Sequence, residues 1–271
     1  MNINLNYFDA HNHLQDLRLT PFRSKIVVEI SAAGIKSMVV NASSQEDWQD
    51  VLELARSHQW IVPAFGLHPW YLESATPKWR TNLEDLLDAI PSTIGEIGLD
   101  RRKRGLDFEK QLEFFRIQLG IAGERDLSTS IHCIDAWGAL LSALTTSKIP
   151  ERGFLLHSYG GSIELIPSLT KLGAFFSFPG SYLNETKIAK LATFKHIALE
   201  RILIETDAPD QLLPIELDSY NLTSHDLRLN HPSNIIAVYK GLASALNISL
   251  EKLCEQVEKN YRSLFGNCMR S

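Results

Sequence analysis

Short apolar runs alternate with longer amphipathic segments along the whole chain. Several of the runs are continuously apolar, a pattern typical of strands buried on both faces of a parallel sheet. We predict strands at residues 3–8, 35–41, 60–66, 93–97, 128–133, 153–157, 173–178 and 201–206.

Helix-like segments lie between these predicted strands, and two more close the chain. We predict helices at residues 20–30, 48–54, 83–90, 107–124, 137–144, 162–172, 187–196, 232–246 and 250–265. Eight strand–helix alternations without a linker-like composition predict an α/β fold, a single (β/α)8 TIM-type barrel spanning residues 1–271 with C-terminal closing helices. A three-layer open α/β sheet is the alternative.

Length and charge narrow the possible functions. The 271 residues suit one such barrel, which typically needs about 250. The net charge of −5 argues against binding nucleic acid through a global positive field, so any such contact requires a local patch or metal ions.

Composition also bears on location. No apolar run approaches the roughly 20 residues needed to span a bilayer, so we expect no membrane partner. The start of the chain does not have the basic and apolar regions of a signal peptide. Cys133, Cys254 and Cys268 make neither a disulfide framework nor a zinc-knuckle spacing. We therefore expect a cytoplasmic protein, and a monomer.

Polar residues of metal-binding types gather at the ends of the predicted strands. His11 and His13 follow the first strand and share a face, because side chains two apart in an extended chain point the same way. A lone pair of this kind is more often a surface feature. Residues of the same types recur at the ends of later strands, namely His68, Glu96, His132, His157, Glu205 and Asp207. Since active sites of such barrels lie at the C-terminal ends of the strands, the coincidence on six strands favours a metal site.

The residue types indicate the chemistry. Imidazole and carboxylate ligands suit Zn, Mn or Mg, and the absence of thiolate argues against a closed structural zinc site. Four histidines and two carboxylates are too many for one tetrahedral ion, but a bridging Glu96 would allow two divalent metal ions to clamp the attacking and leaving oxygens of a displacement. Asp207 could position the attacking water or accept its proton. Glu205 suits a supporting or leaving-group role.

Five motifs together resemble the TatD family of metal-dependent deoxyribonucleases, a group of amidohydrolase-like barrels. The motifs are Asp9-Ala10-His11-Asn12-His13-Leu14, Gly66-Leu67-His68-Pro69, Gly95-Glu96-Ile97-Gly98-Leu99-Asp100, Glu205-Thr206-Asp207-Ala208-Pro209 and Asn260-Tyr261-Arg262-Ser263-Leu264-Phe265. The resemblance implies that the metal ligands are His11, His13, Glu96, His132, His157 and Asp207, with His68 and Glu205 around the scissile phosphate. It also implies hydrolysis of DNA phosphodiesters, often from a 3′ end.

The chain departs from the family pattern near the substrate. Ile134 stands where family members usually carry arginine, and Ser158-Tyr159 stands where Cys-Phe is common. The loop at residues 228–232 reads Arg-Leu-Asn-His-Pro in place of a pattern like Arg-Asn-Glu-Pro. No predicted ligand is lost, but the substrate contacts are expected to differ.

Two surface features are candidate substrate contacts. Arg101, Arg102 and Arg104 follow the Gly-Leu-Asp segment and are either a solvated loop or a clamp for substrate phosphates. Trp70 and Tyr71 follow His68 and either pack over the barrel rim or stack on an unpaired base.

Three functions fit these observations. The first is a metal-dependent nuclease acting on DNA, in particular a 3′–5′ exonuclease on single-stranded DNA, because an unpaired end avoids the cost of pulling a base from a duplex. The second is an amidohydrolase-type barrel acting on a small ester, amide or phosphoester; such barrels often carry a carbamylated lysine where this chain has Glu96. The third is a non-catalytic binding protein, against which the complete ligand set argues.

Overall fold

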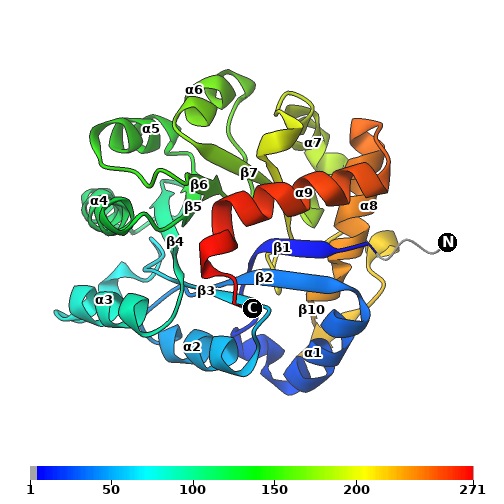
Figure 1. Ribbon diagram of the computed structural model, residues 1–271, viewed down its shortest axis with the longest axis horizontal. Helices are drawn as coiled ribbons and strands as arrows, with labels where there is room; N and C mark the ends of the chain where they lie inside the picture. Colours follow the sequence, from blue (N-terminus) through cyan, green and yellow to red (C-terminus); the bar gives the residue numbers. More distant parts are fainter. Residues whose placement is uncertain (1–4, 271) are drawn as a thin grey trace.

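Eight parallel strands form one sheet in the order β1 to β8, surrounded by helices (Figure 1). The computed structural model describes residues 5–270. This arrangement is the predicted TIM barrel. The strands are β1 Tyr7–Asn12, β2 Ile35–Asn41, β3 Ile61–Phe65, β4 Thr93–Asp100, β5 Thr129–Ile134, β6 Phe154–Leu156, β7 Ala174–Pro179 and β8 Ile202–Glu205.

The helices fall into an outer ring and one closing helix. The ring consists of α1 Arg23–Ala32, α2 Trp48–Ser57, α3 Trp79–Ala89, α4 Phe108–Arg125, α5 Trp137–Thr146, α6 Ile166–Lys171, α7 Ile188–Phe194 and α8 Ile235–Leu246. The closing helix is α9 Leu250–Phe265. Short 3-10 segments precede several helices, among them Leu17–Phe22 before α1.

Backbone hydrogen bonds join the end of β1 to the segment that follows β8. The Asp207 amide donates to the carbonyl of His11 (2.9 Å), and the His13 amide donates to the carbonyl of Ala208 (2.7 Å). These bonds place the segment after β8 beside the end of β1. Two groups of predicted site residues, almost 200 positions apart in the sequence, therefore meet.

Helix α9 covers the N-terminal end of the barrel, and Figure 1 shows it in red across the ring of strands. The Asn260 side chain donates to the carbonyls of Leu199 (2.8 Å) and Ile202 (2.7 Å), at the start of β8. The Tyr261 hydroxyl lies 3.0 Å from that of Ser37 near the start of β2. Because α9 closes the N-terminal end of the barrel, a functional site is expected at the C-terminal end.

Two strand predictions were wrong in their bounds. The first strand runs from Tyr7 to Asn12 rather than from 3 to 8, so His11 lies within it; residues 3 and 4 lie outside the described part. Strand β4 continues to Asp100, so Glu96 lies inside it rather than at its end. Gly95 and Gly98 weaken the strand signal there, and the β4–β5 register is irregular between Ile94 and Ile97. Such irregularities re-aim side chains near active sites.

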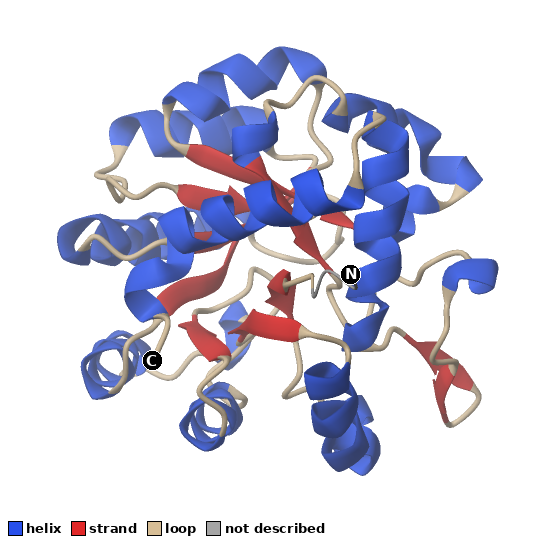
Figure 2. Cartoon of the chain, turned by 45° about the vertical axis from the view of Figure 1, so that its right-hand side comes forward, coloured by secondary structure: helices blue, strands red, loops and turns tan. Residues whose placement is uncertain are grey.

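The segment after β8 was predicted to be a polar loop, but it contains a short antiparallel hairpin. Its strands are β9 Leu222–Ser224 and β10 Leu227–Leu229, which project from the barrel in Figure 2. They are too short and too exposed to give a clear hydrophobic alternation. None of the helices described has both the length and the apolar character needed to cross a membrane.

Candidate active site

Seven polar side chains predicted from the sequence meet at the C-terminal end of the barrel. His11 comes from β1, Glu96 from β4 and His132 from β5. His13, His68, His157 and Asp207 come from the segments after β1, β3, β6 and β8. The structure thus brings together all six residues that the resemblance implies as ligands, with His68 beside them.

Glu96 stands at the centre of the cluster, and its two oxygens face different histidines. Oε2 lies 3.4 Å from Nε2 of both His11 and His13. Oε1 lies 2.8 Å from His157 Nε2 and 3.0 Å from His132 Nδ1. A carboxylate placed between two sets of nitrogen atoms has the arrangement that a bridging ligand needs.

Asp207 completes the first of these sets. Its Oδ1 lies 3.5 Å from His11 Nε2 and 3.4 Å from His13 Nε2. The ligand atoms of three groups each lie within 4.8 Å of one another: His11, His13 and Asp207; His11, Glu96 and His157; and His68, Glu96 and His132. These buried His, Glu and Asp clusters fit a divalent metal in residue type and spacing.

Hydrogen bonds on the far side of the rings orient three of the histidines. His13 Nδ1 lies 2.7 Å from the carbonyl of Asn41 and must donate to it, which leaves Nε2 to face the cluster. His11 Nδ1 lies 2.7 Å from Ser130 Oγ, and His132 Nε2 lies 3.3 Å from Asp100 Oδ2. Such contacts behind a metal-binding imidazole fix its tautomer and raise its basicity.

His68 is oriented the opposite way. The Trp70 amide donates to His68 Nδ1 (3.2 Å), and Nε2 points at Glu96 Oε1, 3.4 Å away. Burial lowers the pKa of His68 to about 4, so near neutral pH the ring is uncharged. Its single proton then belongs on Nε2, because Nδ1 accepts. His68 is therefore a neutral hydrogen-bond donor facing the cluster.

The electrostatics favour a cation. Burial alone would raise the pKa of Glu96, but the neighbouring imidazoles, His157 first, hold that pKa well below its usual value. Burial likewise works against a charge on His13, yet the hydrogen bonds that it donates to Asp207 and Glu96 raise its pKa well above the ordinary value. The buried carboxylates thus attract positive charge strongly. Glu96 Oε1 is also buried without a hydrogen bond from any described residue, which fits a role as a metal ligand.

Glu205 lies behind the cluster rather than in it. Its side chain is 0% exposed, and its Oε1 lies 3.7 Å from His157 Nδ1. The Ser158 amide (2.8 Å) and the Ser158 and Ser177 hydroxyls donate to its two oxygens. Of the supporting and leaving-group roles predicted for Glu205, this buried position behind His157 fits the supporting one.

A cleft of about 930 Å³ opens above the cluster. Trp70, Tyr71, Arg102 and Ile134 line it, and the two aromatic residues are 38% and 45% exposed. Trp70 also donates from Nε1 to Asp100 Oδ2 (2.7 Å), so this residue both packs on the rim and faces solvent. The arrangement leaves room for an unpaired base beside the cluster.

The three predicted arginines separate in space. Arg102 lines the cleft and pairs with Asp135 (3.0 Å). The guanidinium of Arg101 instead lies 3.8 Å above the Phe108 ring, and Arg104 is exposed on the loop. Of this run, the structure brings Arg102 to the cleft.

Sequence reasoning missed Asp100, Ser130 and Asn41, which hold the backs of the rings. Asp100 belongs to the motif at residues 95–100, but a strand predicted to end at Ile97 indicates no role for it. In a strand that continues to Asp100, side chains alternate between the two faces, so Asp100 lies on the same face as Glu96. A longer predicted strand would therefore have indicated Asp100 as a site residue. The contacts of Ser130 and Asn41 with histidines more than 25 positions away left no local signal.

We expect Asp100→Asn to weaken divalent-metal binding about 10- to 100-fold, because the neutral amide holds the His132 tautomer less firmly than a carboxylate does. Calorimetric titration of EDTA-stripped protein with Mn²⁺ measures this loss. Asp85→Asn, an exposed change on α3, is the matched control. Equal affinity of the two variants would contradict the assigned role of Asp100.

An eight-stranded barrel with clustered His and carboxylate side chains at its C-terminal end defines a class of barrel hydrolases. Comparison with known families specifies the class further: the model described as TatD related DNase matches residues 8–266. The chain belongs to the TatD family of metal-dependent hydrolases.

Individual relatives match nearly the whole chain. It is 27% identical over 267 residues to the 3′-5′ ssDNA/RNA exonuclease TatD of Citrobacter koseri, covering 96% of this chain and 98% of that protein. It is 28% identical over 269 residues to the uncharacterized metal-dependent hydrolase YjjV of Escherichia coli, with coverage of 96% and 98%. The crystal structure of YjjV matches the fold with a TM-score of 0.86 at 24% identity, covering 96% of this chain and 98% of that one.

Proposed function

We propose that this protein is a metal-dependent nuclease that trims single-stranded DNA stepwise from its 3′ end. The observation that carries the proposal is the Glu96-centred cluster at the floor of an open cleft. Relatives of similar length that are named 3′-5′ ssDNA/RNA exonucleases support the polarity and the single-stranded substrate.

In this proposal the Glu96 cluster would hold two divalent ions. Besides Glu96, the ligands would be His11, His13 and Asp207 from one group of side chains, and His132 and His157 from the other. When bound, such ions stabilise the negative charge that develops on phosphoryl oxygens. The donor set fits this task, because it combines neutral imidazole nitrogen with carboxylate oxygen and contains no thiolate.

Side chains of the cluster are suited to proton transfer and to binding of the phosphate. Asp207 lines the cleft, and its neighbours lower its pKa against the effect of burial, with His13 the strongest of them. It is therefore ionised and able to accept the proton of an attacking water. His68, neutral with its proton on Nε2, donates a hydrogen bond to a phosphate oxygen. Glu205 keeps His157 in place.

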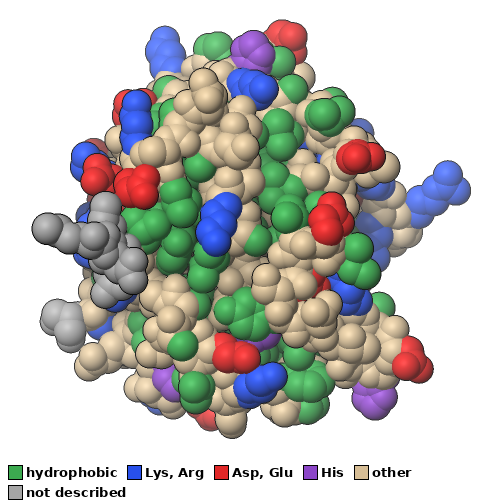
Figure 3. Space-filling view, turned by 90° about the vertical axis from the view of Figure 1, so that its right-hand side faces the viewer, with side chains coloured by type: hydrophobic (Ala, Val, Ile, Leu, Met, Phe, Trp, Pro, Cys, Tyr) green, Lys and Arg blue, Asp and Glu red, His purple; other side chains and the backbone are tan. Residues whose placement is uncertain are grey.

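The surface charge favours local rather than global recognition of DNA. On the face shown in Figure 3, basic side chains lie scattered among acidic and apolar ones rather than in one field. The net charge of −5 agrees with this picture. Arg102, Trp70 and Tyr71 at the cleft are suited to one strand: a cation for phosphate and aromatic faces for bases.

A 5′-labelled single-stranded oligonucleotide tests the proposal. With Mg²⁺ or Mn²⁺ we expect a ladder that shortens from a free 3′ end, and little cleavage when that end is chemically blocked. Closed circular single strands serve as the control for internal cutting. Equal cleavage of circles would indicate an endonuclease. Hydrolysis of a small ester or amide, without cleavage of nucleic acid, would instead support the alternative of an amidohydrolase-type enzyme.

A further inference from the structure

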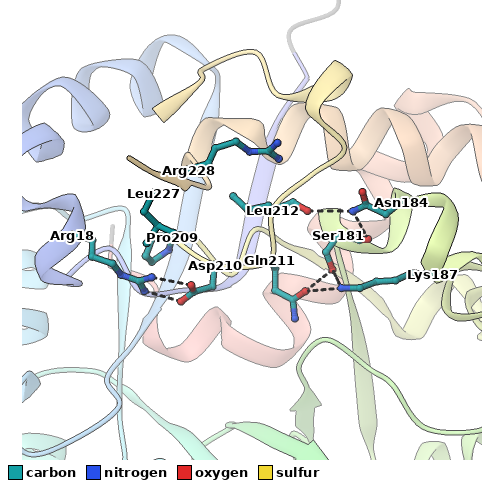
Figure 4. Close-up of a pocket in the computed structure, with 10 residues that line it drawn as sticks. All are labelled: Arg18, Ser181, Asn184, Lys187, Pro209, Asp210, Gln211, Leu212, Leu227 and Arg228. Atoms are coloured by element: carbon teal, nitrogen blue, oxygen red, sulfur yellow. Dashed lines mark hydrogen bonds and ion pairs between the residues drawn. The ribbon is translucent and has the colours of Figure 1, made fainter. Parts of the chain in front are cut away.

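A second hollow, of about 410 Å³, opens beside the catalytic cleft (Figure 4). Arg18, Lys187, Asp210 and Gln211 line both spaces, so the two are continuous. Its wall is formed by the segment directly after Asp207 and by the 3-10 segments before α7. A strand bound in the cleft therefore has this hollow next to it.

Lys187 differs from the other cations of the hollow. Arg18 pairs with Asp16 (2.7 Å) and Asp210 (2.8 Å), and Arg228 lies 3.5 Å from Asp218. Lys187, by contrast, pairs with no carboxylate of the described residues; its Nζ donates to Ser181 Oγ (2.9 Å) and Gln211 Oε1 (3.4 Å). The ammonium is thus held in place by neutral groups, and its charge is left for another anion.

Partial burial makes this charge costly without an anion. The Lys187 side chain is half-buried, and burial lowers its pKa. A phosphate that approached Nζ would restore the lost electrostatic stabilisation and accept a charge-assisted hydrogen bond. Neutral partners on the lysine mean that no existing ion pair has to break first.

The distribution of charge around the cleft favours binding of an anionic chain near Lys187. Glu46, Asp47 and Asp50 line the side next to α2. Elsewhere in the cleft Asp16 and Asp210 pair with Arg18, and Asp135 pairs with Arg102, whereas Lys187 and Lys190 pair with no carboxylate of the described residues. A polyanion is repelled from the first side and attracted to the basic residues.

We propose that Lys187, positioned by Ser181 and Gln211, binds a backbone phosphate of the nucleic-acid substrate next to the scissile one. The inference rests on the proposed function and adds a phosphate site to it. Among the described residues Lys187 forms no hydrogen bond or ion pair with the Glu96 cluster, so it contributes to holding the strand and not to the chemical step. The ligand is a phosphodiester anion, and free phosphate or a mononucleotide presents similar chemistry.

The test measures binding of single-stranded oligonucleotides to EDTA-treated protein, in which cleavage is suppressed. For Lys187→Gln we expect affinity about tenfold lower at low salt and a log–log salt slope reduced by about 0.7, the value for one lost phosphate contact. Lys195→Gln, an exposed change at the C-terminal end of α7, the helix that Lys187 precedes, should resemble the wild type. Thermal unfolding of both variants checks that the fold is kept.

Oligonucleotides with one neutral methylphosphonate linkage locate the contact. In the wild type, neutralising one linkage near the 3′ end should weaken binding. In Lys187→Gln, neutralising that same linkage should not change the affinity, while every other linkage should behave as in the wild type. Inorganic phosphate and mononucleotides as competitors show whether an isolated phosphate suffices. The same losses in Lys187→Gln and the wild type at every linkage would overturn the inference.

Failure of this site and failure of the proposed function give different results. If metal-loaded wild type trims DNA but Lys187→Gln binds and cleaves normally, the inference is wrong and the function stands. If Lys187 supports binding but no nucleic acid is cleaved, the phosphate site stands and the proposed function is wrong.

Discussion

Glu96→Ala should bind divalent metal far more weakly and lose at least about a thousandfold in kcat on single-stranded DNA, while remaining folded. The expected loss follows from the central place of this carboxylate, whose two oxygens face separate groups of histidines. Metal assistance is worth several kcal/mol of transition-state stabilisation, and each 1.4 kcal/mol is about a tenfold change in rate. The fold should survive, because the side chain lies at the barrel end and removing it relieves a buried charge.

Metal content after dialysis, kcat and circular dichroism together measure this result. Glu124→Ala, an exposed change on α4, serves as the control and should behave as the wild type. A Glu96→Ala protein that is fully active after EDTA treatment would rule out the bridging role.

Gly98→Ala should destabilise the protein by about 3 kcal/mol or more and disturb the active site at the same time. Gly98 has a φ of +154°, and a Cβ placed there would lie 2.0 Å from the backbone oxygen of His132. Either β4 or β5 must move, and β5 carries His132. For a chain of this size the expected fall in Tm is roughly 6–12 °C.

Gly138→Ala on α5 is the matched control, since a Cβ there would meet nothing within 4 Å. Alanine favours helix over glycine, so this variant should be as stable as the wild type or slightly more stable. Thermal unfolding and Mn²⁺ affinity of both variants are the measurements. A Gly98→Ala protein with unchanged Tm and metal affinity would show that the two strands are not packed as closely as described.

The barrel was predictable because each of its strands has a clear hydrophobic pattern in the local sequence. Apolar runs such as residues 35–41, which form β2 with the bounds predicted, are buried on both faces and followed by amphipathic helices. Helix α9 was equally clear, because its apolar positions repeat with helical period. The glycines of β4 and the short hairpin β9–β10 carry weak local signals, and their bounds were missed for that reason.

The composition of the candidate site was predictable, but its internal order was not. Eight residues of the right types at strand ends suffice to predict a cluster, and seven of them meet while Glu205 stands behind His157. Which nitrogen of each ring faces inward depends on distant partners, such as Asn41 for His13. The same holds for Lys187, whose surroundings come from Ser181 and from Gln211 in the segment after the neighbouring strand β8. Contacts of this kind arise only when the chain is folded.

The central claim is that ions held around Glu96 make this barrel a nuclease. The most direct measurement titrates metal-free protein with Mn²⁺ while following, in the same sample, bound metal and the trimming of 5′-labelled single-stranded DNA. The account predicts no cleavage without metal, and cleavage that rises as the second equivalent per chain binds. Cleavage by protein stripped of metal, or a fully loaded protein that leaves DNA intact, would contradict it.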